Sequence, residues 1–198
     1  FIICAVRING GKSMEQNSLS YEEKLYTQIE DAYGKLLYTY TTQIIHAGRI
    51  KRKNQIIKWA QIILSAISTG GFIGTIIING VVLLWVGGLC STALLVLTAY
   101  LKDTDLAATY VKHLETSNQL WCLREEYISL LTDCMNLSTD EIVSKRDELQ
   151  KRTASIYSSA PITDNKSYEM AKKALKENKA QFFTRDELNM MLPISLRK

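Results

Sequence analysis

The stretch that decides the fold is residues 59–101, WAQIILSAISTGGFIGTIIINGVVLLWVGGLCSTALLVLTAYL. It lies between Lys58 and Lys102 and contains no Asp, Glu, Lys, Arg or His. It is roughly twice as long as the ~20 residues that a helix needs to cross a hydrocarbon core. Asn79-Gly80, near its middle, is the strongest turn signal in the stretch. The sequence therefore predicts a transmembrane hairpin with spans at 59–78 and 81–101, made antiparallel by a turn at 79–80.

A buried hairpin inside a soluble protein is the alternative interpretation. The whole chain has 198 residues, of which 22% are charged, with a formal net charge of +4. A soluble helix of this length normally shows a polar face, and this stretch has no charged one. The segments on either side are too polar and too short to wrap two uncharged helices, so we favour the membrane hairpin.

Basic residues flank the hairpin on one side, whereas its turn carries no charge. Short loops rich in Lys and Arg stay in the cytoplasm, so both termini of this multi-pass chain are predicted to be cytoplasmic. A basic excess beside a membrane suits anionic lipid headgroups, and no direct binding of nucleic acid is expected. The residues predicted to contact headgroups are Arg49, Lys51, Arg52, Lys53, Lys58 and Lys102.

The rest of the chain has helical patterns. Ser20 and Glu23 form a capping box, and the apolar periodicity after it predicts one helix that runs into the first span. The second span is predicted to continue past residue 101 as a cytoplasmic helix, so that the two extensions pack as an antiparallel stalk. Capping boxes at Ser138 and Thr184 predict two later helices, with another helix at about 166–178 between them.

These patterns predict an all-α fold, a two-span transmembrane helical hairpin with long cytoplasmic helical extensions. Residues 1–20 are expected to be poorly ordered, and whether 1–13 are native stays open. The expected organisation is a cytoplasmic N-terminal helix at 21–58, the hairpin at 59–101, cytoplasmic helices at 102–157 and a C-terminal helical extension at 158–198.

No constellation of catalytic or metal-binding residues is present in the sequence. Gly10-Gly-Lys-Ser13 resembles the end of a phosphate-binding loop, but Val6 stands where that motif has its first glycine. The four cysteines lack metal-ligand spacing and are expected to be free thiols. We therefore predict no enzyme, no metal site and no cofactor. His46 and His113 could face each other across the stalk and sense pH, which is a hypothesis for these two side chains.

Hydroxyl and amide side chains recur along one face of the first span, with a shorter set on the second. Phe72 is the only large apolar residue on the first line and is the candidate gate. Glycines on the spans are candidates for close helix packing. The polar stripe is Gln61, Ser65, Ser68, Thr75, Asn79, Ser91 and Thr98, and the packing glycines are Gly70, Gly74, Gly87 and Gly88.

Two interpretations of this polar stripe stay open. In one, its side chains bond to their own helix or across the pair, and the stripe is only an interhelical contact. In the other, several hairpins assemble as a ring, the stripe lines a pore and Phe72 closes it by dewetting. Two spans cannot enclose a water path alone, so the second interpretation requires a homo-oligomer.

The layout resembles a known family. A tyrosine-bearing N-terminal helix, the basic run RIKRK at 49–53, two spans joined by a minimal turn and the long following segment at 101–133, LKDTDLAATYVKHLETSNQLWCLREEYISLLTD, are similar to the SLATT proteins. These are two-span membrane effectors of bacterial conflict systems. The resemblance covers residues 21–157, implies no catalytic residues and leaves 158–198 as the expected member-specific addition.

The resemblance implies an oligomeric pore-forming or membrane-disrupting effector of the bacterial inner membrane that acts in antiphage defence. Its expected partners are the lipid bilayer, further copies of itself and a cytoplasmic sensor that triggers it. That sensor would be a nucleotide-signalling enzyme or a reverse transcriptase, bound through the C-terminal region. The alternatives are a two-span anchor or scaffold that recruits a cytoplasmic partner without conducting, and a transporter subunit.

Overall fold

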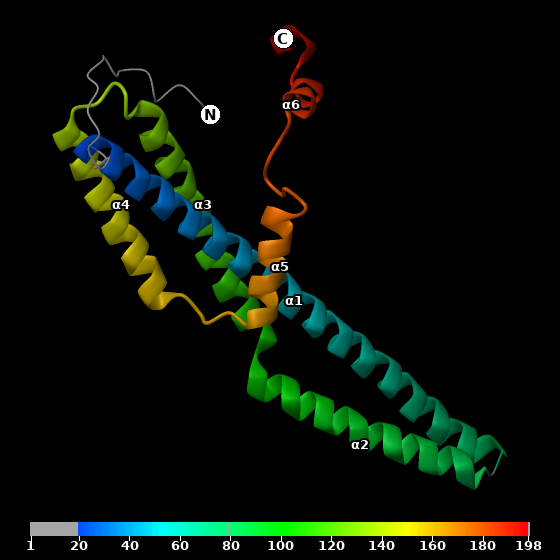
Figure 1. The fold of residues 1–198 in the computed structure, drawn as a ribbon. Helices are drawn as coiled ribbons and strands as arrows, with labels where there is room; N and C mark the ends of the chain where they lie inside the picture. The colour runs from blue at the N-terminus through cyan, green and yellow to red at the C-terminus, as the bar shows by residue number, and fades with distance from the viewer. Residues whose placement is uncertain (1–19, 79, 198) are drawn as a thin grey trace.

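The computed structural model describes residues 20–78 and 80–197, and within these ranges it is helical with no strand (Figure 1). This confirms the predicted all-α fold class. Outside the described residues lie Asn79 and positions 1–19, which make up all but Ser20 of the segment expected to be poorly ordered and include the Gly10–Ser13 run. In chain order the elements are α1 (Tyr21–Ile78), α2 (Val81–Thr104), α3 (Leu106–Asp133), α4 (Thr139–Ser159), α5 (Asn165–Lys176), α6 (Arg185–Met191) and the 3-10 turn η1 (Ile194–Leu196).

Helix α1 is one uninterrupted helix of 58 residues, as predicted. The capping box forms at its start, where the Ser20 N–H donates to Glu23 Oε2 at 2.8 Å and the Glu23 N–H donates to Ser20 Oγ at 3.2 Å. At 1.5 Å per residue the helix is about 87 Å long, so it serves both a membrane span and the bundle beside it.

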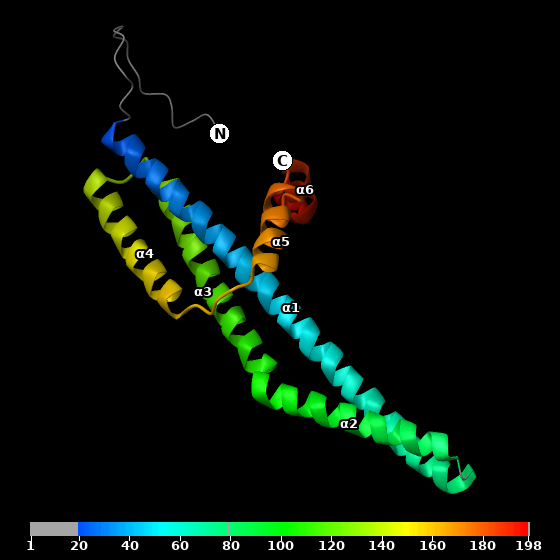
Figure 2. The same ribbon diagram turned by 60° about the horizontal axis from the view of Figure 1, so that its bottom comes forward.

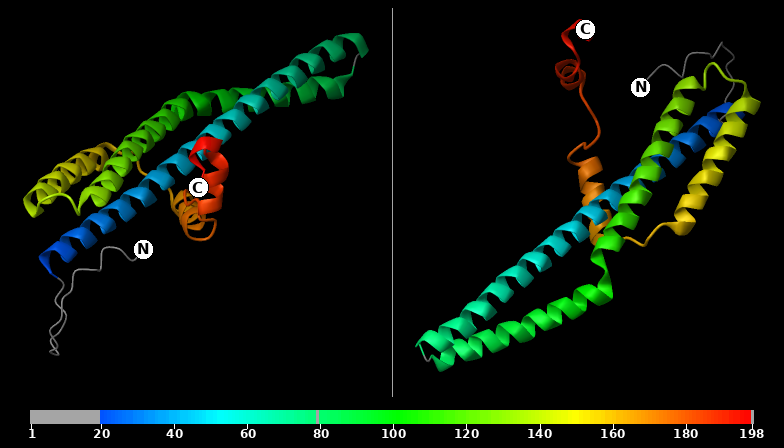
Figure 3. Two further views of the ribbon diagram at one scale, coloured as in Figure 1. Left: turned by 90° about the horizontal axis from the view of Figure 1, so that it is seen from above. Right: turned by 180° about the vertical axis from the view of Figure 1, so that it is seen from behind.

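Helices α1 and α2 form the predicted hairpin. They lie close together at the turn and diverge toward the other end of α2 (Figures 1 and 3). The most apolar windows of the two candidate spans have mean hydropathies of 1.6 and 2.2, with only 11% and 6% of those residues buried. A soluble core helix would bury such a surface, so this exposure supports a lipid-facing hairpin.

A helix follows the second span as expected, but it is a separate helix, α3, and not a straight continuation of α2. The chain breaks at Asp105, which adopts φ 32° and ψ 62° in the left-handed region. Its N–H donates to the Leu101 carbonyl at 3.3 Å and closes α2, while its side chain accepts from the Ala108 N–H at 3.0 Å and caps α3. Asp tolerates this conformation and competes well for helix-end amides, which explains why the helix stops here.

A three-helix stem extends from the hairpin. It consists of the first half of α1, the antiparallel α3, and α4, which folds back after the confirmed capping box of Ser138 and Glu141 (Figure 2). The contact between α1 and α3 confirms the predicted stalk. Its core side chains are Leu25, Ile29, Leu36, Leu120, Leu123, Tyr127, Leu130 and Leu149.

The C-terminal part leaves this stem. After α4 the chain crosses to α1, where α5 packs, and α6 and η1 then project away from the bundle (Figures 1 and 2). The capping box of Thr184 and Glu187 is confirmed, but α6 has no buried residue. Helix bounds agree with the predicted ones within a few residues, whereas the division into functional domains stays a prediction.

Candidate functional site in the membrane hairpin

The two spans approach each other closely at Gly71 and Gly87. A Cβ added at Gly71 would lie 3.0 Å from the Leu83 carbonyl oxygen and 3.3 Å from the Gly87 Cα. Any larger residue at Gly71 would therefore meet backbone, which cannot move aside as a side chain can. Gly71 is not among the predicted packing glycines, because the Gly-x-x-x-Gly spacing in the first span joins Gly70 to Gly74.

Two of the four predicted packing glycines do not pack within the chain. A Cβ on Gly70 or Gly88 would meet nothing within 4 Å, whereas one on Gly74 would lie 3.1 Å from Leu83 Cδ1 and one on Gly87 3.4 Å from the Ser68 carbonyl oxygen. One residue is a 100° step around a helix, so the contact line passes through Gly71 and leaves Gly70 to one side of it.

Two polar side chains meet beside these glycines. The hydroxyl oxygens of Ser68 and Ser91 are 2.5 Å apart, and Ser68 Oγ donates to the Gly87 carbonyl at 3.2 Å. Ser68 is only 8% exposed. Within one chain, these stripe residues contact the sister helix.

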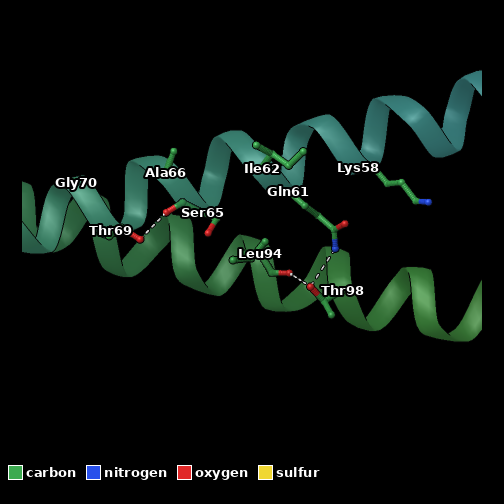
Figure 4. Close-up of a pocket in the computed structure, with 9 residues that line it drawn as sticks. All are labelled: Lys58, Gln61, Ile62, Ser65, Ala66, Thr69, Gly70, Leu94 and Thr98. Atoms are coloured by element: carbon green, nitrogen blue, oxygen red, sulfur yellow. Dashed lines mark hydrogen bonds between the residues drawn. The ribbon is translucent and has the colours of Figure 1, made fainter.

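A second polar contact lies where the helices diverge. Gln61 Nε2 donates to Thr98 Oγ1 at 3.1 Å, as Figure 4 shows, and Thr98 Oγ1 donates to the Leu94 carbonyl at 2.8 Å. An open groove follows between α1 and α2. It is lined by Lys58, Gln61, Ile62, Ser65, Ala66, Thr69, Gly70, Leu94 and Thr98.

The other stripe residues that the structure describes, Ser65 and Thr75, are not joined across the pair. Ser65 lines the groove, and Thr75 Oγ1 donates to the Gly71 carbonyl of its own helix at 2.8 Å. Phe72, the candidate gate, is 44% exposed and does not line the groove. The structure thus brings four of the predicted stripe residues together in two pairs and leaves Phe72 accessible.

The six basic residues predicted to contact headgroups lie in different surroundings. Lys53 Nζ donates to Tyr100 Oη at 2.7 Å, and Lys58 lines the groove, both next to the hairpin. Lys51 lies over the Tyr110 ring at 5.7 Å, while Arg52 and Lys102 are exposed. Arg49 is placed differently from the headgroup prediction, because its guanidinium binds a carboxylate of the C-terminal part of the chain.

A second polar cluster lies in the stem, where the two histidines face each other as predicted. The rings of His46 and His113 are 4.4 Å apart. His113 is 1% exposed and its Nδ1 lies 2.5 Å from Gln43 Oε1. Burial, and then the neighbouring His46, lower the pKa of His113 to about 4. The pairing is thus confirmed, while pH sensing stays a prediction.

The described residues offer no obvious place for metal chemistry. In residues 20–78 and 80–197 no group of three His, Cys, Asp or Glu side chains could hold a metal ion. Cys90 and Cys122 are free thiols.

One comparison with known proteins identifies the family. A family model described as the SMODS and SLOG-associating 2TM effector domain, family 4, matches residues 25–187. The chain belongs to the SLATT family. No curated protein and no solved structure matches it.

Membership agrees with the hairpin as a two-transmembrane unit, and it makes the SLATT chain a membrane effector domain of conflict systems. The family description names an effector domain and no enzymatic activity. The match also extends through α5 and into α6. Residues 158–187 are therefore part of the family domain, which corrects the expectation that the member-specific addition begins at 158.

Proposed function

We propose that this SLATT chain is an oligomeric pore-forming or membrane-disrupting effector of the bacterial inner membrane, acting in antiphage defence. The observation that carries the proposal is an uncharged and largely exposed hairpin that has hydroxyl and amide groups along one side. Two helices cannot enclose water, so the active form is an assembly of several copies.

The groove between α1 and α2 is the surface on which such an assembly would form. Gln61, Ser65, Thr69 and Thr98 present polar atoms there at the depth of the membrane. Placing polar groups against lipid is unfavourable, and a neighbouring copy or water would satisfy them better. Phe72 is exposed on the same span and would then form an apolar constriction.

The alternative function is a two-span anchor that holds a cytoplasmic partner at the membrane. A specific observation favours it, because the pairs Ser68–Ser91 and Gln61–Thr98 satisfy much of the stripe within one chain. In this case the polar stripe is explained by contacts between the two spans of one chain, without a pore.

We place the turn outside the inner membrane and the stem in the cytoplasm, because the basic residues gather where the spans meet the stem. A sensing partner, such as a nucleotide-signalling enzyme or a reverse transcriptase, would bind the C-terminal region. That region carries several exposed large apolar side chains, namely Phe182, Phe183, Met190, Met191, Ile194 and Leu196.

Dye leakage from liposomes separates the two functions. Purified protein reconstituted in dye-loaded vesicles should release the dye. Phe72→Ala should increase the release because it removes the constriction, and filling the groove with Ser65→Leu and Thr69→Leu should suppress it. Ile76→Ala is the matched control, since Ile76 is 81% exposed on the same helix. No release above empty vesicles would favour the anchor.

A further inference from the structure

Helix α5 is attached to the stem by a few polar contacts around one carboxylate. Asp164 is the N-cap of α5, and its side chain accepts from the Ser167 N–H at 2.8 Å. The same carboxylate accepts from Arg49 Nη1 at 2.6 and 2.7 Å, which ties the cap to α1. The Arg49 guanidinium also holds the pKa of Asp164 well below its usual range.

Further polar contacts at the same place extend to α3. Ser167 Oγ lies 2.7 Å from Arg49 Nη1 and 2.9 Å from His46 Nδ1. Gln43 Nε2 donates to the Pro161 carbonyl at 3.1 Å, while its Oε1 receives the Nδ1 proton of His113. Gln43 therefore bridges the segment before α5 and the buried histidine of α3.

The apolar part of this attachment is small. Of the 12 residues of α5 only Ser167, Ala171 and Leu175 are buried, and Tyr168 and Met170 are 48% and 43% exposed. A helix of this length is marginal alone in water. Its order therefore depends on its contacts with α1, and Asp164, whose side chain is 45% exposed, is open to competing ions and solvent.

The attachment lies at a sensitive place in the molecule. His46 and Arg49 are on α1 between the stem core and the basic residues next to the spans, and His113 is two turns after the break at Asp105. The contact of His46 with His113 joins α1 to α3 there, and Figure 2 shows that the chain turns from α2 into the stem at the start of α3.

We propose that α5 is a releasable latch on the α1–α3 pair, closed by the contact of Asp164 with Arg49. Breaking this contact frees α5 while the stem core stays folded. It also uncovers Gln43 and His46, which contact Pro161 and Ser167 when the latch is closed. The latch does not depend on pore formation, because it concerns only the attachment of α5.

Hydrogen–deuterium exchange of the full chain in detergent micelles at pH 7.5 tests the latch. Asp164→Asn keeps a good N-cap and removes the charge, and Arg49→Gln removes the partner. In either variant the amides of 165–176 should exchange at least ten times faster, while those of α4 stay unchanged. High salt should produce the same pattern in the wild type, since it screens exposed ion pairs.

Asp31→Asn is the matched control, because Asp31 forms an exposed ion pair with Lys35 on the same helix, away from α5. It should leave exchange in α5 unchanged. If the exchange rate of α5 rises by less than tenfold in the two latch variants, or if that of α4 rises equally, the proposal is overturned. Neither result depends on the dye-leakage assay, so failure of the latch and failure of the pore are distinguished.

Discussion

At the scale of single residues, glycine position decides how the two spans meet. Gly70 and Gly71 are adjacent glycines with different surroundings. The space around Gly70 is open, whereas Gly71 lies against the backbone of α2. Sequence spacing identified a small-residue pattern in the first span but not its register, because the register depends on where the partner helix lies. The polar contacts were anticipated as a set, while the pairing of Ser68 with Ser91 needed the structure.

Exchanging each of these two glycines for alanine tests the contact. Gly71→Ala should destabilise the hairpin by about 1–3 kcal/mol, since overpacking against fixed backbone has that cost. Gly70→Ala should be neutral or slightly stabilising, because alanine is the better helix former and the space is open. Thermal unfolding in detergent micelles measures the difference, and equal melting temperatures for the two variants would count against the observed register.

At the scale of elements, the helix starts were predictable and the break between α2 and α3 was not. The three capping boxes are local, because each needs only two side chains three residues apart, and all three form. The break depends on Asp105 adopting a left-handed conformation, which many aspartates in helical sequences do not adopt. The attachment of α5 joins residues more than a hundred positions apart, so no local pattern indicated it.

The contact between α1 and α3 should depend on pH through His113. Its pKa is lowered to about 4, so the folded state resists protonation while the unfolded state accepts a proton below about 6.5. Stability should therefore be full above pH 6.5 and fall by about 1.4 kcal/mol per unit between pH 6.5 and 5. Asp164 adds no pH dependence in this window. Its pKa is lowered, so its contribution to stability is constant above its ordinary pKa and is lost only at lower pH.

Chemical unfolding of the wild type and His113→Gln at pH 7 and pH 5 measures this effect. The wild type should lose about 2 kcal/mol over this range, and the variant, which has no imidazole at that position, should lose clearly less. The same loss in both proteins would show that His113 does not carry the dependence.

At the scale of the whole molecule, one long helix links the hairpin to the three-helix stem. Because α1 is continuous from Tyr21 to Ile78, the stem and the first span share one helix. The second span lacks this rigid link, since Asp105 separates α2 from α3. The uncharged hairpin and its two-span layout followed from the sequence, because lipid imposes a simple length and composition rule. The positions of the C-terminal helices could not be predicted from the sequence, because they depend on contacts between residues far apart in the chain.

The most direct test of the central claim is the labelling of single cysteines in intact bacterial cells. In a chain without its native cysteines, Val81→Cys lies beside the turn and Met135→Cys at the far end of the stem, and the two side chains are 65% and 70% exposed. A maleimide that cannot cross membranes should label position 81 in intact cells and position 135 only after permeabilisation. Labelling of position 135 in intact cells, or protection of position 81, would contradict a hairpin that crosses the inner membrane twice with its stem in the cytoplasm.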